Sequence, residues 1–212
     1  MSFLLKDQAY DKLIQLINEG KLQYGETYSL NALSKNLEMS RTPVRDAIQK
    51  LADEKRIDVL PSRGIRLHQM STEELTQHYH FSTAIEGYCA ASLAENREAD
   101  SQQGCLHRMR EIVAGMWELA DSDQEFEKFF SLDQQFHREL LESLGDPYFS
   151  SLQNSPMGFF NHPELQQMTG RISRKDICQC HQVILDAVLE GDSSKAYKGV
   201  MNHAALMYRT LL

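Results

Sequence analysis

Apolar residues recur at helical spacing in two short segments near the N-terminus, residues 30–37 and 40–51. Only Glu38 and Met39 separate these segments, which is the spacing of a helix-turn-helix. Ser40 is placed to cap the second helix. The apolar face of that helix is Val44, Ala47, Ile48 and Leu51. Its outward face is polar and cationic, with Arg41, Thr42, Arg45 and Gln49.

Two short alternating segments follow, residues 56–60 and 64–67, and a Pro-Ser-Arg-Gly turn at 61–64 joins them. This pattern predicts a β-hairpin with Arg63 at its tip. A helix-turn-helix followed by such a wing is typical of DNA-binding domains. The exposed face of the second helix fits the major groove, where Arg41 and Arg45 would reach base edges. Arg63 would meet phosphate or the minor groove.

From residue 71 onward the pattern is helical, and no segment alternates like a strand. Ser71 and Glu74 form a capping-box sequence that marks a boundary. We therefore expect two domains, a DNA-binding domain over 1–70 and an all-helical domain over 71–212, and a mostly α fold. The expected helices, which suggest an antiparallel bundle, are 72–95, 100–121, 123–144, 146–154, 174–190 and 193–211.

Charge is divided unevenly between the two parts. Residues 1–70 contain 11 Lys and Arg against 9 Asp and Glu, whereas residues 71–212 contain 11 against 21. The C-terminal part is therefore strongly acidic, and we expect any contact with nucleic acid to be confined to the N-terminal part.

The four cysteines are too few for a disulfide scaffold, and we expect reduced thiols. Cys178, Cys180 and His181 lack a second cysteine pair at zinc-finger spacing. The N-terminal sequence lacks the apolar core of a signal peptide, and no apolar run is long enough to span a bilayer. These features favour a cytoplasmic protein with no membrane association.

Four polar residues interrupt the apolar faces of three C-terminal helices: Asp133, His137, His181 and His203. Three imidazoles and a carboxylate around one divalent cation would satisfy all four. Two alternatives are open, a metal-free pocket in which these residues bind a small molecule directly, and a metal-dependent hydrolase. The hydrolase is disfavoured because the sequence has no nucleophile motif or HExxH. The other histidines, expected at the surface or at pocket edges, are His68, His78, His80, His107 and His162.

Residues 6–69 resemble the N-terminal domain of the GntR family of bacterial transcription regulators, most specifically in the Ser-Arg-Thr-Pro-Val-Arg run at 40–45. The resemblance implies that operator DNA is contacted by Ser40, Arg41, Thr42, Arg45, Arg63 and Gly64. Two positions depart from the family pattern. Glu38 replaces the small residue usual in the turn, and Asn31 replaces a residue that is often charged.

Residues 130–140 and 181–192, together with His203, resemble the FCD ligand-sensing domain of the FadR subfamily. The resemblance implies a divalent metal, zinc or nickel, held by Asp133, His137, His181 and His203. It also implies a small organic acid or related metabolite as effector, and a homodimer that represses transcription from a pseudo-palindromic operator. No effector-binding residue is assigned.

Three features of the C-terminal part depart from the FCD pattern. Ser82 stands where an arginine is usual, four residues before Glu86, and would favour a different or less acidic effector. Cys180 replaces a commonly acidic residue before His181. Residues 154–172 match poorly, and we expect them to form a pocket wall particular to this protein.

Overall fold

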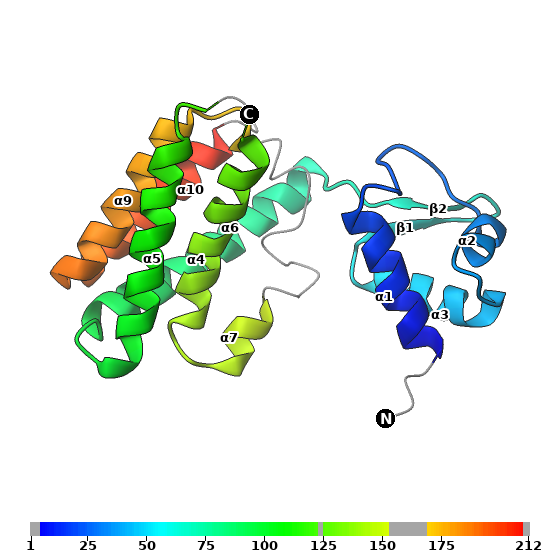
Figure 1. The fold of residues 1–212 in the computed structure, drawn as a ribbon, viewed down its shortest axis with the longest axis horizontal. Helices are drawn as coiled ribbons and strands as arrows, with labels where there is room; N and C mark the ends of the chain where they lie inside the picture. Colours follow the sequence, from blue (N-terminus) through cyan, green and yellow to red (C-terminus); the bar gives the residue numbers. More distant parts are fainter. Residues whose placement is uncertain (1–4, 123–124, 153–168, 210–212) are drawn as a thin grey trace. The chain divides into compact units, whose positions relative to one another are not determined.

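The computed structural model describes residues 5–122, 125–152 and 169–209. It divides the chain into two compact units, Met1–Gln69 and Met70–Leu212, and each unit has its own hydrophobic core. Figure 1 shows the helices of both units and the two strands of the first. The predicted fold class, mostly α with a small β-hairpin, is confirmed.

The first unit is organised around one helix of the helix-turn-helix. Its elements are α1 (Leu5–Asn18), α2 (Leu30–Asn36), α3 (Arg41–Asp53), β1 (Ile57–Leu60) and β2 (Gly64–Leu67). Helix α3 contacts α1, α2 and β1. Its four predicted core residues are at most 6% exposed, and burial of such aliphatic side chains stabilises a helix too short to persist alone.

The turn between α2 and α3 places Glu38 in the left-handed region, with φ +54°. The backbone N–H of Glu38 donates to the carbonyl of Lys35 at 3.2 Å, and the N–H of Met39 donates to that of Ser34 at 3.0 Å. A left-handed residue at this point explains why a small residue suits the turn, because a Cβ atom is unfavourable there.

The wing is an antiparallel pair in which Ile57 lies opposite Leu67 and Leu60 opposite Gly64. Tyr28, which precedes α2, adds a bridge to Ile65 on the other edge of β2. The N–H of Tyr28 donates to the carbonyl of Ile65 at 2.7 Å, and the N–H of Ile65 donates back at 2.9 Å. The wing is therefore tied to the helix-turn-helix, a contact that the sequence did not predict.

The second unit is a helical bundle. Its described helices are α4 (Thr72–Glu95), α5 (Asp100–Leu119), α6 (Phe126–Glu142), α7 (Pro147–Ser151), α9 (Arg174–Glu190) and α10 (Ser193–Tyr208). Helix α4 packs against α6, α9 and α10, and α5 packs against α6 and α9. The predicted capping box is present, because Ser71 Oγ accepts from the Glu74 N–H at 3.2 Å and Glu74 Oε2 accepts from the Ser71 N–H at 3.0 Å.

Some helix ends and one helix face differ from the sequence prediction. Helices α5, α6, α7 and α10 are shorter than expected, and most of the predicted pocket wall at 154–172 lies outside the described residues. On α6 the helical spacing of Phe126, Phe130 and Leu140 predicts one apolar stripe, but the fully buried aromatic residues are Phe129 and Phe136, and Phe126 and Phe130 are only half-buried. Among the described helices, none combines the length and apolarity needed to cross a membrane.

Candidate metal centre and nucleic-acid interface

The outward face of α3 carries the predicted DNA-contacting residues. Ser40, Arg41, Thr42 and Arg45 are all exposed, while the opposite face of the helix packs into the core. Ser40 occupies the N-cap position, but its hydroxyl makes no capping hydrogen bond. The first turn of α3 therefore presents free backbone N–H groups and two arginines, an arrangement that suits phosphate and base edges.

The guanidinium groups on this surface are available for binding. Within the described part of the chain, the side chains of Arg41, Arg45 and Arg63 make no hydrogen bond or ion pair. Neighbouring cations are already engaged: Arg66 pairs with Asp58 at 2.9 Å, and the Lys50 ammonium lies 3.9 Å from the centre of the Tyr10 ring. Of these five cations, the three free ones are those the sequence singled out.

Gly64, also predicted at the interface, has a structural reason to be glycine. Its φ is +120°, and a Cβ atom built there would clash with the backbone carbonyl of Tyr28. The close approach of β2 to Tyr28 therefore requires glycine. Any contact between Gly64 and DNA would be made by its backbone.

The four predicted metal-ligating residues converge in the second unit. Asp133 and His137 lie on α6, one turn apart, His181 lies on α9 and His203 lies on α10. Each offers one ligand atom, and all four atoms lie within 4.8 Å of one another. The four residues are at most 8% exposed, so the cluster is sealed inside the bundle.

The distances within the cluster match a coordination polyhedron. The Nε2 atoms of His137 and His203 are 3.2 Å apart, and His181 Nε2 lies 3.7 Å from Asp133 Oδ1. A tetrahedral ion with bonds of about 2.1 Å separates its ligand atoms by about 3.4 Å. Within the described residues, buried Asp133 Oδ1 and His181 Nε2 have no hydrogen-bond partner. A cation between them would satisfy both atoms, so these residues fit a divalent metal.

A buried carboxylate from a fourth helix orients one of the imidazoles. Glu86 on α4 is 5% exposed, and its Oε2 accepts a hydrogen bond from His137 Nδ1 at 2.7 Å. This contact directs the Nε2 lone pair of His137 toward the cluster, as carboxylates commonly do behind metal-bound histidines. The sequence alone indicated no role for Glu86 in this site.

Two apolar side chains fix the second imidazole, and the sequence pointed to neither. The Phe136 ring stacks on His181 with a centroid separation of 4.2 Å and an interplanar angle of 12°. On α5, Met116 Sδ lies 3.3 Å from His181 Nδ1. Phe136 directly precedes His137 in the sequence, but the sequence does not show that its ring stacks on a residue of another helix.

Burial and mutual charge set the protonation of the metal-free cluster. Burial raises the pKa of Asp133 to about 6 and lowers that of His203 to about 3. It also lowers the pKa of His181 well below its usual range. Burial alone would lower the pKa of His137, but the carboxylates of Glu86 and Asp133 outweigh it and raise that pKa to about 9. Without metal, the cluster therefore keeps a proton on His137 at neutral pH.

Among the described residues, the remaining histidines and the cysteines lie outside the cluster. His80 and His107 are exposed, His68 is half-buried, and His162 lies outside the described residues. His78 is only 7% exposed, so a surface position for it is wrong. All four cysteines are free thiols, as the sequence predicted, and none belongs to the potential metal group found among the described residues.

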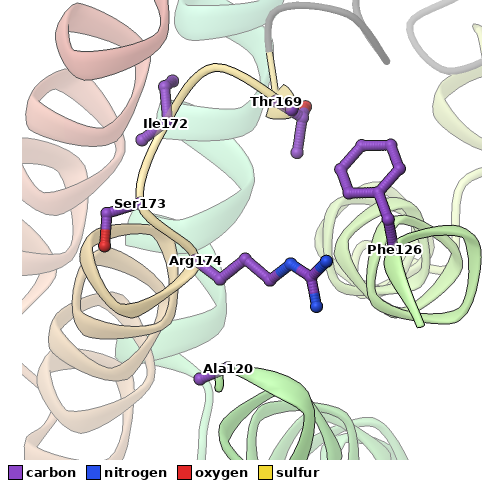
Figure 2. Close-up of a pocket in the computed structure, with 7 residues that line it drawn as sticks. Ala120, Phe126, Thr169, Ile172, Ser173 and Arg174 are labelled. Atoms are coloured by element: carbon purple, nitrogen blue, oxygen red, sulfur yellow. The ribbon is translucent and has the colours of Figure 1, made fainter. Parts of the chain in front are cut away.

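A separate cavity of about 270 Å³ lies where the end of α5 and the start of α6 approach the start of α9. Figure 2 shows Arg174 extending across it toward Phe126. The Arg174 guanidinium donates to the carbonyls of Leu119, at 3.1 Å, and Ser122. These bonds satisfy carbonyls at the end of α5, so we assign Arg174 a structural role. The four clustered residues do not line this cavity.

Comparison with known families matches both units. Residues 5–67 match the model of bacterial regulatory proteins of the gntR family, and residues 77–206 match the FCD domain. The second match alone covers more than half of the chain.

Individual relatives are similar along most of the sequence. The chain is 26% identical over 203 residues to a Paenarthrobacter nicotinovorans protein named as the probable transcriptional repressor of a D-xylose utilization operon, covering 93% of this chain and 84% of that protein. It is 29% identical over 125 residues to the Escherichia coli repressor RspR, covering 58% of this chain and 51% of RspR.

Solved structures share the fold. A Rhodococcus sp. RHA1 structure described as a GntR regulator superposes with a TM-score of 0.73 at 18% identity, covering 97% of this chain and 96% of that one. Escherichia coli McbR/YncC superposes with a TM-score of 0.69 at 17% identity, covering 98% of each chain.

Proposed function

Because this chain belongs to the gntR family of bacterial regulatory proteins and carries an FCD domain, we propose that it is a metal-dependent, effector-responsive repressor. The chain is a transcription regulator, and its family and named relatives are regulators rather than enzymes. The observation that carries the metal-dependent part is the sealed cluster of three imidazoles and one carboxylate.

The predicted domain of residues 1–70, which contains the first unit, is the operator-binding domain in this proposal. The free guanidinium groups of Arg41 and Arg45 donate hydrogen bonds to base edges in the major groove. Ser40 and Thr42 hydrogen-bond to the nearby DNA backbone. Arg63 and the Gly64 backbone bring the wing to phosphate. In a homodimer two α3 helices enter successive major grooves about 34 Å apart, which requires a pseudo-palindromic operator. The protein works in the cytoplasm, where that DNA lies.

The predicted domain of residues 71–212, which is the second unit without Met70, holds the metal and the effector in this proposal and joins the two protomers. Asp133, His137, His181 and His203 hold zinc or nickel, because both ions accept imidazole and carboxylate ligands. The ion supplies a positive charge that attracts electron-rich groups of an effector. Glu86 and Phe136 hold the imidazoles in position when the centre is empty.

The metal-bound form is favoured over the metal-free alternative by the unpaired buried atoms. Without an ion, Asp133 Oδ1 and His181 Nε2 face each other at 3.7 Å with no hydrogen-bond partner among the described residues. Unsatisfied buried polar atoms of this kind destabilise a folded protein.

An effector that binds one conformation of the dimer more tightly shifts the affinity of the dimer for the operator.

Operator binding tests the first half of the proposal. With a DNA fragment selected in vitro by the wild-type protein, Arg41→Ala and Arg45→Ala should each weaken binding by about 1–3 kcal/mol, measured by fluorescence anisotropy. Lys50→Ala is the matched control on the same helix, because its ammonium already lies against Tyr10. Equal affinities for all three variants and the wild type would disprove the assignment of α3.

Elemental analysis tests the second half. The purified wild-type protein should contain about one zinc or nickel ion per chain, and the variant with both His181→Ala and His203→Ala should contain none. His107→Ala, an exposed histidine, is the control and should keep its metal. Full metal content in the double variant would show that other residues bind the ion.

A further inference from the structure

The cationic side chains of the second unit all lie away from the metal centre's buried surroundings. Met70–Leu212 contains eleven Lys and Arg residues, and nine of them are exposed. The other two are held at helix ends: Arg97 Nη1 donates to the Ala94 carbonyl at 3.4 Å, and Arg174 Nη1 donates to that of Leu119 at 3.1 Å. The sequence of segments 123–124, 153–168 and 210–212 contains no Lys or Arg. Within this unit, a buried ligand at the centre therefore finds no cationic side chain as its partner.

The charges of the occupied centre already balance. Histidines coordinate a metal through a lone pair and are neutral when bound, whereas Asp133 and Glu86 each contribute one negative charge. Two carboxylates offset the two positive charges of a divalent ion. A carboxylate effector would therefore add a buried negative charge that no cation of the unit compensates.

The unpaired polar atoms beside the centre include both a hydrogen-bond donor and an acceptor. Gln134 adjoins Asp133 in sequence and hydrogen-bonds to its carboxylate, and Gln134 Oε1 remains buried without a partner among the described residues. His203 Nδ1 is buried and unpaired in the same way. When His203 coordinates through Nε2, its proton lies on Nδ1. A hydroxyl group donates and accepts, whereas a carboxylate only accepts and cannot satisfy Gln134 Oε1.

We propose that the effector of this centre is an uncharged, hydroxyl-bearing small molecule, a polyol or a sugar in chemical class, rather than a carboxylate. This inference rests on the proposed metal-binding function of the second unit and names the class of ligand it accepts. An uncharged ligand leaves the charge balance of the centre unaltered, and one of its hydroxyl protons is donated to Gln134 Oε1.

Matched ligand pairs test the charge argument directly. The full-length protein, loaded with zinc or nickel, is titrated calorimetrically with glucitol, xylitol, glucose and xylose, and with the corresponding acids gluconate and xylonate. Each pair keeps the carbon chain and changes one terminal group into a carboxylate. At least one uncharged compound should bind about tenfold or more tightly than its acid partner. Tighter or equal binding of the acids, or no binding by any uncharged compound, would overturn the proposal.

Substitutions at one position test the hydrogen-bonding argument. Gln134→Leu removes the unpaired acceptor and should weaken binding of the uncharged ligand about tenfold. Gln134→Lys supplies a cation and should move the preference toward the acid. Gln135→Leu is the control, because Gln135 bonds to Ser131 on the outside of the helix and should leave both affinities unchanged. If Gln134→Leu and Gln135→Leu act alike, Gln134 does not contact the ligand.

Two further measurements separate this proposal from the proposed function. Elemental analysis reports whether the metal is bound, and anisotropy reports whether the operator is bound. A protein that binds metal and operator but prefers the acids refutes only the uncharged effector. A protein without metal refutes the metal centre itself.

Discussion

At the scale of single residues, the surroundings of Glu86 and the backbone conformation of Glu38 are determined by constraints that the neighbouring sequence does not show. Glu86 lies 51 positions before His137 in the sequence, yet its carboxylate orients that imidazole at 2.7 Å. Glu38 adopts a left-handed φ that glycine would adopt more easily. Glu86 supports the candidate metal centre, whereas Glu38 introduces local backbone strain into the turn.

Glu86→Gln should weaken metal binding about tenfold, because the amide holds His137 less firmly than a carboxylate does. The affinity is measured by competition with a chromophoric chelator at pH 9.5, above the raised pKa of His137, so that protons do not compete with the metal in either protein. Glu118→Gln, at an exposed position on α5, is the control and should bind metal as the wild type does. An unchanged affinity in Glu86→Gln would show that the carboxylate has no part in holding the site.

Glu38→Gly should stabilise the first unit by about 0.5–1 kcal/mol, because relief of the left-handed strain exceeds the added freedom of the unfolded chain. Chemical denaturation followed by circular dichroism measures the change. Glu38→Ala also removes the charge but keeps a Cβ atom, so it should not stabilise. If both variants stabilise equally, the cause is charge and not backbone conformation.

At the scale of elements, the sequence predicted the existence of the helices more accurately than it predicted which of their faces pack together. The capping box at Ser71 and the core face of α3 follow from local pattern, and the structure has both. On α6, phenylalanines at 126, 129 and 130 leave more than one apolar face possible, and packing against α4 and α5 selects the face containing Phe129. Periodicity alone could not choose between these faces.

The candidate site likewise combines residues that the sequence indicated with residues that only the packing of the helices brings together. The polar residues on apolar faces indicated Asp133, His137, His181 and His203, because a buried charge or imidazole needs a partner. The partners from other helices, Glu86 and Met116, depend on the packing of α4 and α5 and leave no local pattern. The bridge between Tyr28 and β2 was equally hidden, because a single residue forms it.

Gly64→Ala should destabilise the first unit by about 2 kcal/mol or more, because the new methyl group meets the Tyr28 carbonyl at a φ that alanine disfavours. Thermal and chemical unfolding measure the loss, and operator affinity should fall with it. Gly25→Ala is the control: its φ is +82°, but a Cβ there has open space, so the loss should be about 1 kcal/mol. Equal losses would show that the contact with Tyr28 is unimportant.

At the scale of the whole molecule, the two units differ in net charge as well as in fold. Residues 1–70 have two more cations than anions, whereas residues 71–212 have ten more anions than cations. DNA attraction is therefore confined to one unit, and it should weaken as salt rises. The acidic unit encloses the candidate metal centre, and we expect metal binding there to be linked to proton release.

Metal affinity should rise with pH between about 7 and 9, by up to about tenfold per pH unit. The metal-free His137 has its pKa raised to about 9, so in this range each bound ion displaces one proton. Below about pH 6, Asp133 is protonated as well and the affinity falls more steeply. Above about pH 9, the affinity should level off.

Calorimetry in buffers of different ionisation enthalpy counts the released protons. Near pH 8 the wild type should release about one proton per ion, and Glu86→Gln fewer, because only Asp133 then remains to raise the pKa of His137. A pH-independent affinity between 7 and 9, with no proton release, would contradict the assigned protonation of the centre.

Helix α4 links the candidate metal centre to the start of the second unit. Its first turn is locked by the capping box at Ser71, directly after the boundary between the units at Gln69 and Met70. Glu86 stands about 21 Å along the same rod, at 1.5 Å per residue. The hydrogen bond to His137 and the capped first turn therefore belong to one continuous helix. A single element thus connects the candidate metal centre with the boundary between the two units.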